Sequence, residues 1–197
     1  MKVTQFTFEN EKKVSPWKSS EKKQLLSTAI FNVNTIDREN SKGQKGTFIE
    51  LESKDWINII PVFTGTDGQE YFIMERQFRH GSASITTEFP AGLIEKGEDP
   101  EAAAKRELLE ETGIKAGKLT KLADICPNSA FMANRAHFYL AEDLDYTGTR
   151  NFDENEDIQT VCLPVKKVLA QMGKDSMDNG IMLISCFLFT RYRGFEV

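Results

Sequence analysis

Apolar residues occur along this chain in short runs of strand length, separated by polar turns. Residues 28–36 and 47–52 are rich in Phe, Ile, Val and Thr, which favour strands. The nearly continuous apolar run at 56–63 indicates a strand buried on both faces. A glycine-bounded turn at 65–68 leads into a further strand at 71–78, so these two strands are predicted to form a hairpin. The other strand candidates are residues 119–125, 136–141 and 158–163.

The strongest helix signal lies at residues 99–112. Pro100 stands in its first turn and Gly113 stands where a C-cap is expected. Residues 163–172 and 177–192 are predicted as two further helices that close the fold. Strands mixed with three helices, without regular alternation of strand and helix, predict an α+β protein built on a mixed sheet.

The first part of the chain is expected to form a unit of its own. Residues 1–24 are polar and lysine-rich, which is typical of irregular structure. A boundary near residue 54 separates a small N-terminal β subdomain, residues 1–54, from a main domain, residues 55–197. Two or three strands are too few to bury a core by themselves. The subdomain is therefore expected to need a partner surface.

Composition excludes several classes of protein. The chain has 197 residues, of which 40% are apolar, and this suffices for a packed core. Its net charge of −5 has the wrong sign for a general nucleic-acid binder. No apolar run is long enough to cross a bilayer, and no signal peptide is readable. We expect a soluble, cytoplasmic protein with neither nucleic-acid nor membrane partners, in which three cysteines form neither a disulfide framework nor a zinc site.

Three glutamates crowd onto one face of the predicted helix 99–112. Glu107, Glu110 and Glu111 are spaced at i, i+3 and i+4, and like charges at that spacing repel each other. Arg106 relieves only part of the repulsion. Such a cluster is either a solvated charged face or a site for a hard divalent cation, which prefers carboxylate oxygens.

The spacing around these glutamates decides between the two readings. Gly92 is followed by five residues, then by Glu98, then by seven residues and the run Arg106-Glu107-Leu108-Leu109-Glu110-Glu111-Thr112-Gly113-Ile114. This pattern resembles the complete Nudix box, and no position departs from it. A chance match in a chain of this length is expected on the order of once in ten million, so the chain is identified as a member of the Nudix hydrolase superfamily.

The resemblance implies a fold and a metal site. The fold would be a Nudix-type α/β/α sandwich with a mixed sheet, preceded by the small β subdomain. Glu107, Glu111 and the backbone carbonyl of Ala91 would bind Mg²⁺ or Mn²⁺, and Glu110 would also point into the site. Arg106 would orient the neighbouring carboxylates. The metal would offset the charge of a bound diphosphate and activate a water.

The residues that flank the box narrow the range of possible substrates. The segments 75–81 and 88–92, Glu-Arg-Gln-Phe-Arg-His-Gly and Glu-Phe-Pro-Ala-Gly, resemble the ADP-ribose and nucleoside-diphosphate-sugar pyrophosphatase branch. By that resemblance Arg79 would bind the diphosphate and Glu88 would line the site. Many ADP-ribose enzymes carry Ser-Pro-Gly after the box, whereas this chain has Ser129-Ala130 at the corresponding place. This departure favours a broader preference for nucleoside diphosphate sugars.

A second acidic segment supplies the candidate base. Residues 153–158, Asp-Glu-Asn-Glu-Asp-Ile, resemble the acidic loop before the last strand of the same branch. Glu154 would act there as catalytic base or as an additional metal ligand, and Glu156 is the alternative.

These features predict a metal-dependent hydrolase that splits nucleoside diphosphate sugars, such as ADP-ribose, into a nucleoside monophosphate and a sugar phosphate. A dinucleoside-polyphosphate, coenzyme-A or RNA 5′-end pyrophosphatase is the alternative within the superfamily, and a non-catalytic ADP-ribose sensor is the alternative outside catalysis. A homodimer that packs or exchanges its N-terminal strands is expected, as in other members of the branch. Trp56 would then either stack on the base or belong to the core.

Overall fold

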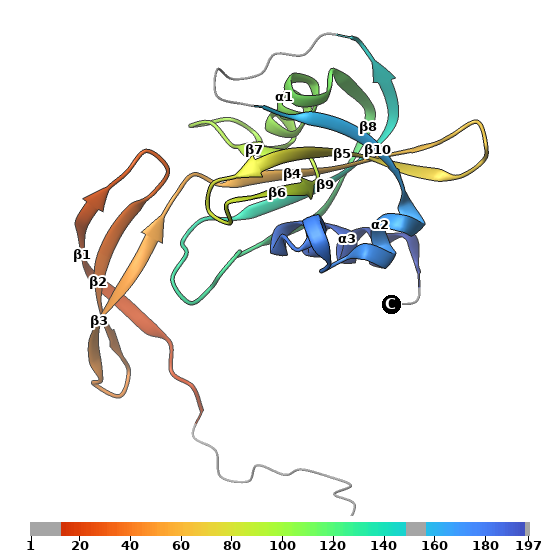
Figure 1. The fold of residues 1–197 in the computed structure, drawn as a ribbon. Coiled ribbons are helices and arrows are strands. Elements are labelled where there is room, and N and C mark those ends of the chain that lie inside the picture. Colours follow the sequence, from red (N-terminus) through yellow and green to blue (C-terminus); the bar gives the residue numbers. More distant parts are fainter. Residues whose placement is uncertain (1–12, 149–156, 196–197) are drawn as a thin grey trace, which may run out of the picture. The chain divides into compact units, whose positions relative to one another are not determined.

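The computed structural model describes residues 13–148 and 157–195 and divides the chain into two compact units, with the boundary between Glu52 and Ser53. In the first unit, three antiparallel strands form a sheet with β2 in the middle. Among the described residues of this unit, Ile36 is the only apolar side chain that is buried. The strands, drawn from red to orange in Figure 1, are β1 (Trp17–Ser27), β2 (Asn32–Asn40) and β3 (Lys45–Glu52).

Strand β1 occupies part of the segment that was expected to be irregular. All eleven of its residues are exposed, so its side chains carry no alternating burial pattern that a sequence could reveal. Its conformation comes from backbone pairing with β2, along a register that runs from Trp17 opposite Asn40 to Ser27 opposite Asn32. The expectation of irregular structure was therefore wrong from Trp17 onward.

The second unit contains a seven-stranded mixed sheet. Its central order is β10-β5-β4-β9-β8, with β6 added to β5 and β7 added to β4. The pair β4–β9 is parallel and the other pairs are antiparallel. The strands are β4 (Trp56–Thr64), β5 (Glu70–Arg79), β6 (Ser84–Glu88), β7 (Ala91–Leu93), β8 (Ile114–Ile125), β9 (Ala136–Tyr146) and β10 (Gln159–Pro164).

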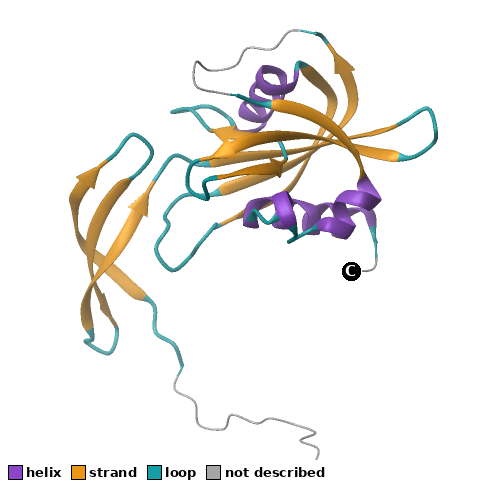
Figure 2. Cartoon of the chain, in the orientation of Figure 1, coloured by secondary structure: helices purple, strands orange, loops and turns teal. Residues whose placement is uncertain are grey.

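Helices cover both faces of this sheet. Helix α1 (Pro100–Thr112) lies on one face, and α2 (Val165–Gln171) and α3 (Gly180–Arg193) lie on the other (Figures 1 and 2). A 3₁₀ turn, η1 (Asp175–Met177), connects α2 to α3. The predicted α/β/α sandwich with a mixed sheet is confirmed. None of the helices in the described part of the chain is long and apolar enough to cross a membrane.

Strand β4 shows why its apolar run is nearly continuous. Ile57 and Ile59 pack toward α1 against Leu108, whereas Ile60 and Val62 pack toward α2 and α3 in a separate cluster. Because successive side chains of a strand point to opposite faces, a strand buried between two helical layers needs an apolar residue at almost every position. The predicted hairpin with β5 is also present.

Local interactions fix both ends of α1. The Asp99 carboxylate accepts hydrogen bonds from the backbone N–H groups of Glu101 and Ala102. At the other end Gly113 adopts a left-handed φ of 72° and donates its N–H to the Leu109 carbonyl at 2.8 Å. These caps satisfy backbone N–H and C=O groups that have no hydrogen-bond partner within the helix. They therefore fix where α1 begins and ends, and with it the positions of its glutamates.

Candidate active site

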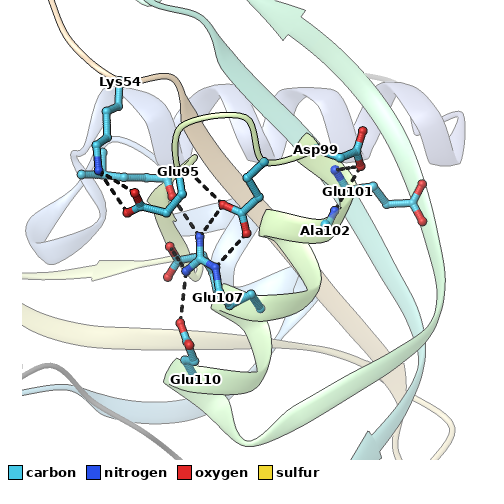
Figure 3. Close-up of polar contacts among 10 residues, drawn as sticks. Lys54, Glu95, Asp99, Glu101, Ala102, Glu107 and Glu110 are labelled. Atoms are coloured by element: carbon cyan, nitrogen blue, oxygen red, sulfur yellow. Dashed lines mark hydrogen bonds and ion pairs between the residues drawn. The ribbon is translucent and has the colours of Figure 1, made fainter.

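Arg106 lies at the centre of the carboxylates that the box brings together. Its guanidinium donates to Glu98 at 2.9 and 2.8 Å, to Glu107 at 2.8 Å and to Glu110 at 3.1 Å. It also donates to the backbone carbonyl of Leu93 at 3.1 Å. Figure 3 shows Glu107 and Glu110 on the same side of α1. The planar fork of arginine suits this task, since its five N–H donors can serve several carboxylates at once.

The strongest of these pairs holds the loop that precedes α1. Hydrogen bonds from Arg106 and from the Glu95 backbone N–H lower the pKa of Glu98 to about 2, against a smaller opposing effect of desolvation. The same contact with Glu98 raises the pKa of Arg106. Glu98 therefore stays ionised and ties the loop to the helix. Its contacts with Arg106 and Glu95 are structural.

Two carboxylates of α1 meet the backbone of β7. The N–H of Ala91 donates to Glu111 at 3.1 Å. Gly92 leaves room for the other carboxylate, because a Cβ at this position would lie 2.0 Å from Cδ of Glu107. Glu107 and Glu111 are thus both placed beside Ala91 and Gly92, and the three candidate metal ligands Ala91, Glu107 and Glu111 lie together.

This arrangement fits a divalent cation that keeps part of its shell in water. No three histidine, cysteine, aspartate or glutamate side chains form a metal-holding cluster within residues 13–148 and 157–195. Mg²⁺ is commonly bound through one or two carboxylates, with waters and substrate phosphates as the remaining ligands. The protein ligands of such a cation could be the buried Glu111, the neighbouring Glu107 and the backbone of Ala91.

Arg79 and Glu88 form a two-pronged ion pair beside this group. The guanidinium donates from Nε and Nη2 to the two carboxylate oxygens at 3.0 and 2.9 Å, and the Thr86 hydroxyl donates to the same carboxylate. Burial alone would raise the pKa of Glu88, but the hydrogen bonds from Arg79 and Thr86 outweigh it and lower that pKa. Burial would lower the pKa of Arg79, but its hydrogen bonds to Glu88 and the negative charges of Glu88 and Glu111 raise it. The β5–β6 pair and the box therefore belong to one electrostatic site.

Glu75 is a further buried carboxylate in this region. Its side chain is fully buried, and it faces Glu88 in the register of β5 and β6. Residues 75, 77 and 79 share one face of β5, since side chains alternate along a strand. Glu75 belongs to the flanking motif, but the resemblance implied no role for it. One feature of the sequence could have pointed to Glu75: it is an acidic residue, four positions before Arg79, in a segment expected to be a strand.

Of the remaining candidates, the structure describes Trp56. Trp56 begins β4 and packs, half buried, against a cluster of Ala136, Phe138 and Leu188. This is the core environment that the sequence left open as an alternative, and base stacking by Trp56 stays a prediction. Glu154 and Glu156 lie outside the described residues.

The fold and the site define a class of protein: a hydrolase domain in which a loop, a helix and a loop bring carboxylates together on one face of an α/β/α sandwich. The NUDIX domain model matches residues 57–183, and the chain belongs to the NUDIX family. It is an enzyme of the Nudix hydrolase type, as the box predicted. Enzymes of this family generally depend on a divalent metal ion.

Known relatives agree with the predicted branch. The chain is 34% identical over 155 residues to the ADP-ribose pyrophosphatase of Bacillus subtilis (strain 168), which covers 77% of this chain and 83% of that protein. It is 53% identical over 64 residues to the ADP-sugar pyrophosphatase of Mus musculus, or 32% of this chain and 29% of that protein. A crystal structure of an ADP compounds hydrolase matches with a TM-score of 0.78 and 23% identity over 93% of this chain and 97% of that chain, which shows a shared fold.

Proposed function

We propose that this protein hydrolyses the diphosphate linkage of nucleoside diphosphate sugars, with ADP-ribose as the model substrate, to a nucleoside monophosphate and a sugar phosphate. The observation that carries the proposal is the position of Glu107 and Glu111 beside Ala91, next to the Arg79–Glu88 pair. One site thus holds both a cation-binding edge and a cationic side chain suited to a diphosphate. The names of the two relatives above support the same reaction.

Each residue has a role in this proposal. Glu107, Glu111 and the Ala91 carbonyl would hold Mg²⁺ or Mn²⁺, which offsets the charge of the diphosphate when bound. Arg79, held in place by Glu88, would orient a phosphate oxygen. Arg106 keeps Glu107 and Glu110 in position, so the carboxylates need no reorganisation when substrate arrives.

The proposed chemical step is attack of a water oxygen on phosphorus. A new P–O bond forms to the water oxygen, and the P–O bond to the bridging oxygen of the diphosphate breaks. Glu154 is the proposed acceptor of the water's proton, because a carboxylate that is not occupied by metal remains basic enough to take it. Glu156 is the alternative. The bridging oxygen leaves on the second product as part of its phosphate.

A substrate panel tests the reaction class. The full-length protein is incubated with ADP-ribose, GDP-mannose, a dinucleoside polyphosphate and coenzyme A, each with Mg²⁺ or Mn²⁺, and products are identified by mass. We expect the nucleotide sugars to give a nucleoside monophosphate and a sugar phosphate at the highest kcat/KM. Preferred cleavage of coenzyme A or of the dinucleoside polyphosphate would contradict the assignment, and binding of ADP-ribose without turnover would indicate a sensor.

The proposal extends to location and assembly. Cys126, Cys162 and Cys186 are all free, which is typical of a reducing compartment and supports the cytoplasm. A homodimer formed through the N-terminal unit is proposed as well, since that unit buries so little apolar surface of its own.

A further inference from the structure

A separate cavity of about 200 Å³ lies on the face of the sheet opposite α1. It is lined by residues of β5, β6, β10, α2 and the region of η1. Because side chains alternate between the two faces of a strand, the residues of β5 show on which face of the sheet the cavity lies. Met74 packs in the cluster with α2 and α3, and Ile73 packs in the cluster with α1. Arg76 is on the same face of β5 as Met74 and lines the cavity. Arg79 is on the same face as Ile73 and belongs to the candidate active site.

The cavity is positively charged in an acidic protein. Arg76, Lys167 and Lys174 line it against one acidic residue, Asp175, while the whole chain carries a net charge of −5. Among the described residues, the side chains of Arg76 and Lys167 form neither a hydrogen bond nor an ion pair. Three cations that converge on one concave surface repel each other, and a low-dielectric wall strengthens their shared field. An anion in the cavity would relieve that repulsion.

Two hydroxyl groups also line the cavity. Oγ1 of Thr87 and Oγ of Ser176 lie 2.9 Å apart and join β6 to η1. One of the two hydroxyls donates to the other, which leaves the second hydrogen available to an oxygen of a ligand. Thr87 is also the cross-strand partner of Arg76, so a hydroxyl donor and a guanidinium stand side by side in the cavity wall.

We propose that this cavity is a second ligand site, for a phosphate monoester of the size of a sugar phosphate. A phosphate monoester carries close to two negative charges and three strong acceptor oxygens. These match a guanidinium fork, two ammonium groups and a hydroxyl donor better than a single carboxylate would. Sites for larger ligands usually measure about 300–1,000 Å³. The smaller volume here suits a sugar phosphate and excludes an entire nucleoside diphosphate sugar.

Calorimetric titration of the full-length protein with ribose 5-phosphate and with inorganic phosphate tests the site. EDTA is present throughout, so that binding is measured without metal and without turnover. The variants are Lys167→Gln and Gln171→Glu, which change the charge of the cavity lining. The matched control is Lys166→Gln, since Lys166 is exposed on the same helix and does not line the cavity. Arg79→Gln reports binding at the candidate active site, and thermal unfolding checks that each variant folds.

We expect Lys167→Gln and Gln171→Glu to weaken the binding of ribose 5-phosphate about tenfold or more, the range typical of a lost charge-assisted contact. Lys166→Gln should change it by less than about twofold. Absence of binding by the wild type would overturn the proposal, and so would an equal loss in Lys166→Gln or a loss confined to Arg79→Gln. Equal affinity for inorganic phosphate would overturn the assigned ligand size. Because no turnover is measured, these outcomes are independent of the proposed hydrolysis.

Discussion

At the scale of single residues, the site depends on groups that leave space as much as on groups that fill it. Gly92 carries no side chain, and the Glu107 carboxylate occupies the volume that a Cβ would need. Arg106 then anchors that carboxylate from the other side. Position and charge are therefore set before any substrate binds, which is the condition for effective electrostatic catalysis.

The role of Glu111 can be tested by an isosteric change. Glu111→Gln keeps the size of the side chain but removes the ligand charge, so we expect kcat to fall by about a hundredfold or more at saturating Mg²⁺. The measurement is steady-state hydrolysis of ADP-ribose. Glu101→Gln is the matched control on the same helix, since Glu101 is exposed and contacts Lys105 instead of the site. Near-wild-type turnover in Glu111→Gln would refute the assignment.

The base is tested on the acidic segment. We expect Glu154→Gln to lower kcat by about a hundredfold or more with a much smaller change in KM, because a lost proton acceptor acts on the chemical step. If Glu156→Gln shows that loss while Glu154→Gln stays active, Glu156 is the base. Full activity in both single variants and in the double variant would place the base within the box.

At the scale of elements, the most predictable segment is the one with the most local determinants. Helix α1 was predicted at residues 99–112 and spans Pro100–Thr112. Its start and end depend on Asp99, Pro100 and Gly113, which act within a few residues of themselves. Strands β6 and β7 were not predicted, since they have five and three residues and exist by pairing with β5 and β4.

The ends of the longer strands differ from the predicted ends because pairing between neighbouring strands extends them. The strands predicted at 119–125 and 136–141 extend to Ile114–Ile125 and Ala136–Tyr146. The added residues alternate between charged and apolar side chains and pair with each other across the β8–β9 hairpin. Backbone pairing keeps the charged residues in the sheet, whereas Ile114, Ala116 and Leu144 also pack on the core cluster beside α1. Helix α3 begins at Gly180, later than the predicted 177, because Asn179 caps it.

The loop before α1 should respond to acid. The pKa of Glu98 in the folded protein is about 2, below its ordinary value of 4.5. Its ionised form therefore contributes stability that is present above the ordinary pKa and is lost as the pH falls toward the folded value. We expect the difference in unfolding free energy between wild type and Glu98→Gln to shrink between about pH 6 and about pH 3. Urea unfolding measures it, with Glu101→Gln as control; a difference independent of pH would contradict the role of Glu98.

At the scale of the whole molecule, the two units differ in how they bury apolar surface. The second unit has clusters on both faces of its sheet. The first unit exposes apolar side chains on a sheet of only three strands, among them Leu25, Leu26, Phe48 and Ile49. Large apolar side chains in contact with water favour association with a second apolar surface.

Light scattering tests the proposed dimer. At micromolar concentration we expect a particle of twice the chain mass of 22.3 kDa. Ile49→Asp places a charge on the exposed apolar surface and should weaken dimerisation about tenfold or more. Lys45→Asp, on the same strand, is the control. A fully active wild-type monomer at that concentration would refute the dimer.

By itself, the sequence determined the family, the helix of the box and the identity of the α1 carboxylates. Those features depend on spacing within some twenty residues, and helical geometry converts such spacing directly into a shared face. Only the tertiary structure decided what stands opposite them. Strand register sets Glu75 against Glu88 and Thr87 beside Arg76, and the layering of the sheet assigns Arg79 and Arg76 to opposite faces. Register and layering arise from contacts between distant segments, and a one-residue shift would reverse every face, so no local pattern contains them.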